Sequence, residues 1–264
     1  MSVFPEYIYG AGNMIQIKKR AKIIGNAQWL WLTCALLFSF GALDAAAGVF
    51  TVTPVRIYMT PKDRAIAVTI TNEGDSPVAL QADLNSWQQK PDGTDEMTLT
   101  EDLILSPPII KLAPKARQVV RLALLVPADA SKQLTYRLIL REIPEATSAK
   151  KAGVEVPIAL ALSMPVFITP PIAKREIACS AARADAKNLA VACANSGTAY
   201  SQIREISFKQ KDKVAAKFEG GVYILPGARK VVTVPVTQAI SAGAAQLAVS
   251  FDDGKEQVFD VTLK

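Results

Sequence analysis

Bulky apolar residues occupy every second position of one long stretch, GVEVPIALALSMPVFITP, which runs from Gly153 to Pro170. The alternating positions are Val154, Val156, Ile158, Leu160, Leu162, Met164, Val166 and Ile168. A period of two is typical of a β-strand with one apolar face. Pro157 and Pro165 lack the N–H that a central strand donates, so the pattern predicts a long edge strand. Such an edge invites pairing with another chain; the alternative is a strand that only fills its own core.

Shorter segments of alternating apolar and polar residues, separated by turn residues, follow one another from Gly48 onward, and none of them has a helical period. The segments expected in the first half are 50–58, 65–71, 78–87, 103–108, 119–126 and 134–143. The long strand closes this set. Seven short antiparallel strands within about 120 residues predict an immunoglobulin-like β-sandwich.

The second half repeats motifs of the first. The sequence LAPKARQVV at 112–120 returns as LPGARKVV at 225–232, and Asn72-Glu73-Gly74 returns as Asn195-Ser196-Gly197. The repeat predicts a second, shorter sandwich, with the boundary at Pro170-Pro171, just beyond the long strand. We therefore expect an all-β protein of two immunoglobulin-like β-sandwich domains, formed by residues 48–169 and 170–264.

The first 47 residues predict a secretory signal peptide. A basic cluster from Lys18 to Lys22 precedes an apolar run from Trp29 to Leu43, and Ala45-Ala46-Ala47 supplies the small residues that a signal peptidase requires. Cys34 would be lost with this peptide. An uncleaved anchor is the alternative, although the apolar run is short for a span of about 20 residues. Met14 is an alternative start to Met1.

The composition of the chain argues against several classes of function. The chain has no histidine, which removes Ser-His-Asp and Cys-His catalysis and the commonest zinc and copper sites. Without the leader, which holds four basic and two acidic residues, the net charge falls from +6 to +4 and no basic tract remains. So small a positive charge, without a basic tract, does not indicate nucleic-acid binding. We expect no enzyme, no cofactor, no metal and no membrane span in the mature chain.

Two cysteines remain in the mature chain. Cys179 and Cys193 are separated by SAARADAKNLAVA, a polar turn between two short strands. In an exported protein this arrangement predicts a structural disulfide across a hairpin, and there is no Cys-x-x-Cys motif that would favour a redox role.

Other chemical motifs are weak. Ser148-x-x-Lys151 lacks the companion motifs of penicillin-recognising enzymes, and Asp252-Asp253-Gly254 is typical of a hairpin turn without calcium-loop spacing. Arg56 alternates with Val52 and Pro54 on the first expected strand. An arginine there either needs a partner, if it is buried, or is an ordinary solvated side chain.

Three motifs together resemble one protein family. They are Tyr136–Pro144 (YRLILREIP), the pattern Leu-x-Pro-x-x-x-x-Val-Val-Arg-Leu that ends at Leu122, and Ser106-Pro107-Pro108. Their order over nearly the whole mature chain is similar to that of the periplasmic pilus chaperones of the chaperone–usher pathway. The resemblance implies two domains in an L-shaped arrangement with a cleft between them, periplasmic localisation, and pilus or fimbrial subunits and an outer-membrane usher as partners.

The resemblance also implies how subunits are bound. These chaperones lend a long strand to a subunit that lacks its last strand, and residues 153–168 correspond to that donor strand. Val156, Ile158 and Leu160 match the donated side chains, and Leu162 extends the set. The intervening Ala159 and Ala161 are expected to face the chaperone's own packing, because one step along a strand reverses the face.

The family anchors the subunit's terminal carboxylate with an arginine and a lysine. By resemblance the arginine is Arg56, but the lysine position falls on Pro165. Either Arg121 or Lys174 substitutes for it, or Arg56 acts alone. The family's inter-domain ion pair is half present, since its glutamate matches Glu142 while its arginine falls on Thr169.

Two other classes of function are weaker alternatives. A secreted immunoglobulin-like adhesin or pilus subunit would normally have one sandwich and a donor extension at its own N-terminus. An enzyme is disfavoured by the missing histidine. The sequence does not identify the subunit or the pilus type, and it leaves open whether the free chain self-associates through its exposed strand.

Overall fold

The computed structural model describes residues 50–144 and 159–264, all of which belong to one compact unit, and within these ranges the chain is all-β. No helix in this part of the chain is long and apolar enough to cross a membrane. The first ten strands are β1 (Phe50–Thr53), β2 (Ile57–Met59), β3 (Ala65–Asn72), β4 (Val78–Gln89), β5 (Asp95–Leu99), β6 (Leu103–Ser106), β7 (Ile109–Leu112), β8 (Arg117–Leu124), β9 (Leu134–Glu142) and β10 (Ala161–Ile168). The last seven are β11 (Ile177–Arg183), β12 (Asn188–Asn195), β13 (Ser201–Gln210), β14 (Lys213–Ile224), β15 (Arg229–Pro235), β16 (Gly243–Phe251) and β17 (Glu256–Leu263).

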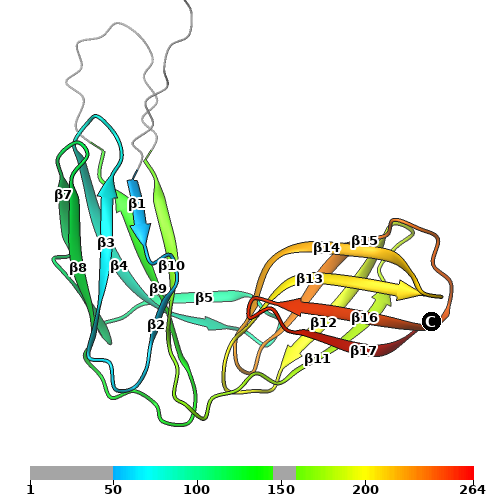
Figure 1. Ribbon diagram of the computed structural model, residues 1–264. Coiled ribbons are helices and arrows are strands. Elements are labelled where there is room, and N and C mark those ends of the chain that lie inside the picture. Colours follow the sequence, from blue (N-terminus) through cyan, green and yellow to red (C-terminus); the bar gives the residue numbers. More distant parts are fainter. Residues whose placement is uncertain (1–49, 145–158) are drawn as a thin grey trace, which may run out of the picture. The chain divides into compact units, whose positions relative to one another are not determined.

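Strands β1–β10 form a sandwich of two sheets (Figure 1). One sheet has the order β1-β3-β8-β6, and the other has the order β2-β10-β9-β4-β5, with β7 also paired to β4. Along β8, for example, Val120 and Leu122 are buried while Val119 and Arg121 are exposed. Alternate residues of both sheets therefore fill one shared core, as the period of two predicts.

The structure differs from the sequence prediction at three strands of this sandwich. The expected first strand, 50–58, is divided at Pro54 into β1 and β2, which pair in opposite sheets. Proline lacks the N–H that would continue a ladder, so the chain changes sheets there. Strands β5 and β7 were not predicted, because β5 is polar and wholly exposed and β7 has only four residues between proline-containing segments.

Strands β11–β17 form a second sandwich, drawn from yellow-green to red in Figure 1. Its sheets have the orders β11-β12-β15 and β14-β13-β16-β17. It has its own apolar core, in which Phe208 on β13 is the largest fully buried side chain. The two cores are separate clusters, as expected for two sandwiches rather than one.

The sequence repeat has a structural counterpart in two buried asparagines. The Asn72 Nδ2 atom donates to the carbonyl oxygens of Ser76 and Ala113, and Asn195 Nδ2 donates in the same way to Ala199 and Ile224. Each side-chain oxygen also accepts the amide two residues later, at 2.9 Å in the first copy and 3.0 Å in the second. Each asparagine therefore stabilises the turn that follows it and links this turn to a distant backbone segment of its own sandwich.

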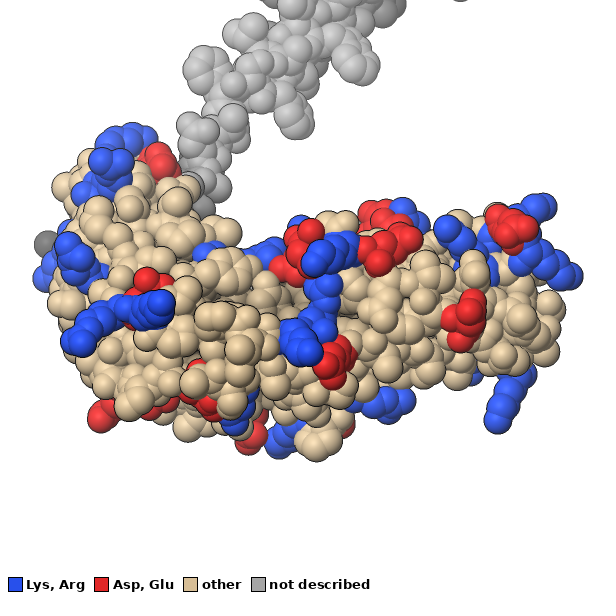
Figure 2. Space-filling view, turned by 60° about the horizontal axis from the view of Figure 1, so that its bottom comes forward, with Lys and Arg blue, Asp and Glu red and all other residues tan. Residues whose placement is uncertain are grey.

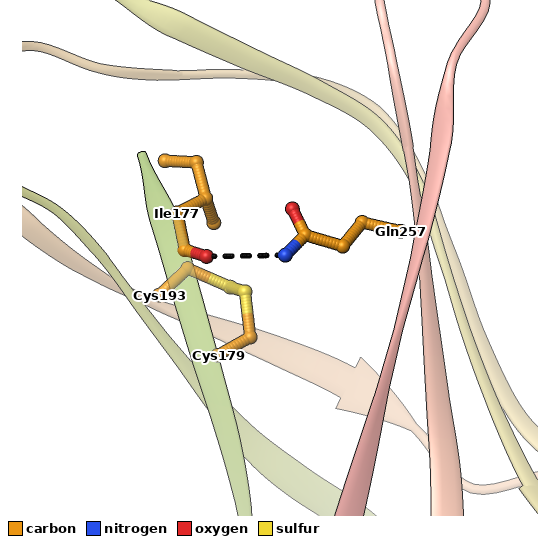
Figure 3. Close-up of a disulfide and its surroundings, with 4 residues drawn as sticks. All are labelled: Ile177, Cys179, Cys193 and Gln257. Carbon is orange, nitrogen blue, oxygen red and sulfur yellow. Dashed lines mark hydrogen bonds between the residues drawn. A yellow bond between two sulfur atoms is a disulfide. The ribbon is translucent and has the colours of Figure 1, made fainter. Parts of the chain in front are cut away.

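The cysteines pair as expected. Cys179 on β11 and Cys193 on β12 are direct cross-strand partners and form a disulfide, with their Cα atoms 4.1 Å apart. Figure 3 shows the bridge beside Gln257 of β17, whose side-chain amide donates to the Ile177 carbonyl oxygen at 3.4 Å. The bridge thus fixes a hairpin whose outer strand also contacts the opposite sheet.

We predict that exported protein, denatured without reductant, has no thiol that a maleimide can label. Replacing both Cys179 and Cys193 with Ala should lower the free energy of unfolding by roughly 3 kcal/mol, because the unfolded chain loses a closed loop. Denaturant titration of both proteins measures the difference. Two labelled thiols in the unmodified protein would contradict the assignment.

Candidate functional site

Strand β10 is paired differently at its two ends. Val166–Ile168 lies between β9 and the parallel strand β2, whereas Ala161–Pro165 pairs with β9 alone among the described residues. The ladder with β9 continues across Pro165, so its missing N–H falls on the other edge of the strand. The first half of β10 is therefore a free edge on which another strand could pair.

The apolar face of β10 extends past the core that it helps to fill. Met164, Val166 and Ile168 are fully buried in the first sandwich. Leu162, the next residue on this face, packs only partly against the core, and Leu160 is 40% exposed. Burial thus decreases steadily toward the N-terminal end of the strand. Val156 and Ile158 lie outside the described residues.

The expectation that Ala159 and Ala161 face the protein's own packing is wrong. Both residues are exposed in the structure. They lie on the face of the strand opposite Leu160 and Leu162, and at this end of β10 no neighbouring element covers that face within the described part of the chain. Enlarging either alanine is therefore not expected to strain the core.

A row of three residues crosses the outer face of this sheet. Pro165 is the direct partner of Arg137 on β9, and Arg56 stands on the other side of Pro165, one residue before Ile57, the partner of Val166. Ile57, Val166 and Leu138 point into the core, so their neighbours Arg56, Pro165 and Arg137 point outward. Two arginines therefore bracket the proline that occupies the expected lysine position.

Arg56 is held by a small polar network. Its Nη1 atom donates to Asp252 Oδ2 at 2.8 Å, and the same oxygen accepts the Tyr200 hydroxyl at 2.8 Å. The Tyr200 and Tyr58 hydroxyl oxygens are also 2.8 Å apart. The Tyr58 hydroxyl and the Asp252 carboxylate raise the pKa of Arg56 above its ordinary value, and burial raises the pKa of Tyr200. At neutral pH Arg56 is therefore a cation and Tyr200 keeps its proton.

Arg137 lies against aromatic rings. Its Cζ atom is 3.8 Å from the centre of the Trp87 ring and 5.5 Å from that of Tyr223. Burial lowers its pKa, but arginine ionises so far above neutral pH that the side chain keeps its charge. Arg137 also lines an open crevice of ≈ 600 Å³ together with Trp87, Tyr223 and Lys230. Stacking thus fixes the position of the Arg137 guanidinium, and the crevice that it lines remains open to solvent.

Two glutamines tie the first sandwich to backbone groups of the second. The Gln89 side chain accepts the Leu225 amide at 2.8 Å and donates to the Tyr223 carbonyl oxygen at 3.1 Å. The Gln133 side chain accepts the Tyr200 amide at 2.8 Å and donates to Thr169 Oγ1 at 2.6 Å. Each amide satisfies a donor and an acceptor at once.

Aromatic packing reinforces this contact. The Phe167 ring of β10 stacks on Tyr200 with ring centres 4.0 Å apart, and Trp87, Phe167 and Leu225 form a small buried cluster separate from the two sandwich cores. The polar network around Arg56 is therefore built against a rigid apolar surface.

The structure does not place the two expected substitute bases in this row. Arg121 is on β8, and its exposed side chain points outward from the other sheet, so the whole thickness of the sandwich separates it from Arg56. Lys174 follows β10, and its carbonyl oxygen accepts the amides of Thr198 and Ala199. Its side chain is exposed, and no ion pair joins it to another described residue.

The inter-domain role expected for Glu142 is not supported. Glu142 ends β9, and its Oε2 atom accepts the Leu160 amide at 3.2 Å, beside the free end of β10. Residues that contact the second sandwich lie at the opposite end of β9, next to Gln133. Thr169, the other half of the expected pair, is bound by Gln133 instead.

Sequence reasoning missed Arg137, Asp252, Gln89 and Gln133 as members of the site. Alternation along YRLIL does place Arg137 on the outer face, between buried Tyr136 and Leu138. Which residue faces Pro165 on the next strand is a matter of register, and that information is absent from a single sequence. Asp252 was read only as a turn residue, which it also is.

The face drawn in Figure 2 shows no patch of charge of a single sign. On the face drawn in Figure 2, basic and acidic side chains are interspersed. Within residues 50–144 and 159–264, no group of three or more histidine, cysteine, aspartate or glutamate side chains is placed to hold a metal ion.

Comparison with known families identifies one match. Residues 49–174 match the family described as pili and flagellar-assembly chaperone, PapD N-terminal domain. A search of curated protein sequences finds no match.

Solved structures of the same fold cover most of the chain. A chaperone in complex with a tip adhesion subunit, from archaic Csu pili of Acinetobacter baumannii, has 18% identity and a TM-score of 0.61, with 82% of this chain and 99% of that chain covered. The E. coli chaperone DraB has 19% identity and a TM-score of 0.53, with 82% and 97% covered. The Salmonella enterica SafB chaperone in complex with SafA pilin has 13% identity and a TM-score of 0.53, with 82% and 97% covered. These matches confirm the expected two-domain fold.

We predict that Gln89→Ala lowers the free energy of unfolding of residues 48–264 by about 1–3 kcal/mol, because the amide of buried Leu225 loses its partner. Gln88→Ala changes an exposed neighbour on the same strand and should alter stability by no more than about 0.5 kcal/mol. Equal effects of the two substitutions on a urea titration would contradict the role given to Gln89.

Proposed function

We propose that the protein, whose residues 49–174 match the model of the pili and flagellar-assembly chaperones, is a periplasmic chaperone that binds, folds and caps pilus subunits. It does so by pairing the first half of β10, together with the apolar stretch before it, with an incomplete subunit sandwich. It then delivers the subunit to an outer-membrane usher. This role requires no catalysis and no cofactor.

One observation carries the proposal: within residues 50–144 and 159–264, the same end of β10 has an unpaired edge and an incompletely buried apolar face. A strand that pairs there gains backbone hydrogen bonds, and a groove that covers the face gains apolar burial. Four side chains, Val156, Ile158, Leu160 and Leu162, at about 1.5–3 kcal/mol each give roughly 6–12 kcal/mol before the cost of ordering. Leu162 contributes less than Leu160, since it is already partly buried.

The row of arginines supports an anchor for the subunit's terminal carboxylate. Arginine's planar fork can donate two parallel hydrogen bonds to a carboxylate. Arg56 and Arg137 bracket Pro165 on the face beside the free edge, so we assign the second cation of the anchor to Arg137. The Acinetobacter and Salmonella structures each contain a chaperone together with a pilus subunit, which is consistent with a subunit as the ligand here.

The expected signal peptide supports export of the chain to the periplasm, where such subunits pass. The two sandwiches and the internal position of β10 argue against a pilus subunit or adhesin, which would normally carry a single sandwich and a donor extension at its own N-terminus.

We predict that Leu160→Asp and Ile158→Asp abolish recovery of pilus subunits with the chaperone from periplasm, because a complex would bury an unpaired carboxylate. Leu160→Asp should hardly change the melting temperature of the free protein, since Leu160 is exposed. Ala161→Asp is the control, because it adds the same charge at an exposed position on the opposite face. Normal subunit yield from both Leu160→Asp and Ile158→Asp would rule out donation of this strand.

We predict that Arg56→Ala and Arg137→Gln each reduce subunit affinity by about 10–100-fold, the range of one lost charge-assisted interaction. Arg141→Gln is the matched control, because Arg141 is on the same strand and face as Arg137 and makes an exposed ion pair with Asp83. Co-purified subunit, quantified against chaperone, measures the effect. A loss with Arg141→Gln as large as with Arg137→Gln would refute the assignment of Arg137.

A further inference from the structure

The residue that contacts the candidate anchor Arg56 is itself a carboxylate from the second sandwich. Asp252 lies in the turn between β16 and β17, and its Oδ2 atom accepts Arg56 Nη1 at 2.8 Å. Asp252 could either occupy the anchor in competition with a ligand or hold it in place for one. The geometry decides between these two roles.

We propose that Asp252 is a positioning residue: it orients Arg56 so that the unused edge of the guanidinium receives the ligand's terminal carboxylate. This inference rests on the proposed function, because it assigns a role within the same carboxylate site. It also means that the anchor is built from both sandwiches, with the binding group on one and its orienting group on the other.

The contact leaves most of the guanidinium free. An arginine side chain has five N–H donors, and Asp252 uses one of them, on a single nitrogen, rather than the paired donors of the fork. The Arg56 side chain is 28% exposed, so solvent and ligand can reach donors that neither Asp252 nor the nearby Tyr58 hydroxyl uses. A competing carboxylate would instead be expected to take both donors of one edge.

Asp252 is itself held in place. Its Oδ2 atom also accepts the Tyr200 hydroxyl at 2.8 Å, and its backbone amide donates to the Gln202 carbonyl oxygen at 3.1 Å. The side chain is only 11% exposed. The turn is closed by Gly254, whose φ of +77° is a left-handed conformation that glycine adopts without strain. Because Tyr200 holds the carboxylate and the backbone of Asp252 is hydrogen-bonded as well, the side chain is not expected to swing aside for a ligand.

Tyr200 links this network to the rest of the site. Its hydroxyl contacts both Asp252 and Tyr58, and its ring stacks on Phe167 of β10. Burial raises the pKa of Tyr200, so the hydroxyl stays a hydrogen-bond donor at neutral pH. Removing that hydroxyl should loosen Asp252 and therefore Arg56, with a weaker effect than removing the carboxylate charge itself.

The next residue provides a matched control. Asp253 lies in the same turn, but its carboxylate pairs with Arg175 and Lys255, both of the second sandwich. Asp252→Asn and Asp253→Asn remove the same charge from adjacent positions. They differ in one respect, which is that Asp252 reaches Arg56.

The test compares two forms of one probe. A short fluorescein-labelled peptide of alternating Val and Thr is prepared with a free C-terminal carboxylate and with a C-terminal carboxamide. Fluorescence anisotropy with the mature chain gives the ratio of the two affinities. In the unmodified protein we expect the acid to bind about 10–100-fold more tightly than the amide, as one charge-assisted anchor provides.

Asp252→Asn should reduce this acid-to-amide ratio by at least about fivefold, and Tyr200→Phe should reduce it by a smaller factor. Asp253→Asn should leave it unchanged. A purely structural role would weaken both peptides equally and leave the ratio constant, which would overturn the inference while the anchor stands. A ratio that rises in Asp252→Asn would show competition and also overturn it. No acid preference in the unmodified protein would overturn the Arg56 anchor and this inference together.

Discussion

The change of pairing along β10 is the constraint on which the site depends. One strand is an interior strand of its own sheet at one end and, among the described residues, pairs on one side only at the other, where we propose that another molecule binds. It does so because β2 is only three residues long and pairs at one end. Beyond that pairing the same apolar face continues, with progressively less of the protein's own core beneath it.

The outer face of the same sheet holds the charged part of the site. Alternation sends Leu162 and Met164 inward and Pro165 outward, so the proposed apolar and charged contacts would use opposite faces of one strand. The arginines come from neighbouring strands rather than from β10. Their positions are set by aromatic stacking at Arg137 and by a carboxylate from the other sandwich at Arg56.

Periodicity in the sequence was sufficient to predict most strands, the two sandwiches and the disulfide, because each depends on local alternation or on a repeated turn. The division of the first strand at Pro54 and the polar strand β5 were not predicted, since both are decided by pairing between distant segments. Contacts between distant segments also determine most of the candidate site, so the sequence did not predict it. Arg56 was proposed from the resemblance alone, whereas the positions of Arg137, Asp252 and the two glutamines follow from cross-strand register and from contacts between sandwiches, which one sequence does not specify.

Pro165 has a further consequence for how a bound strand would leave. Its absent N–H lies on the free edge, so a strand added there has one rung fewer at the level of the arginines and is held at that point chiefly by charge. Salt weakens charge at a partly exposed site far more than it weakens a backbone ladder. In the proposed complex the bound strand would therefore have a weak end and a strong end, and its release would start beside Pro165 and proceed toward the apolar stretch.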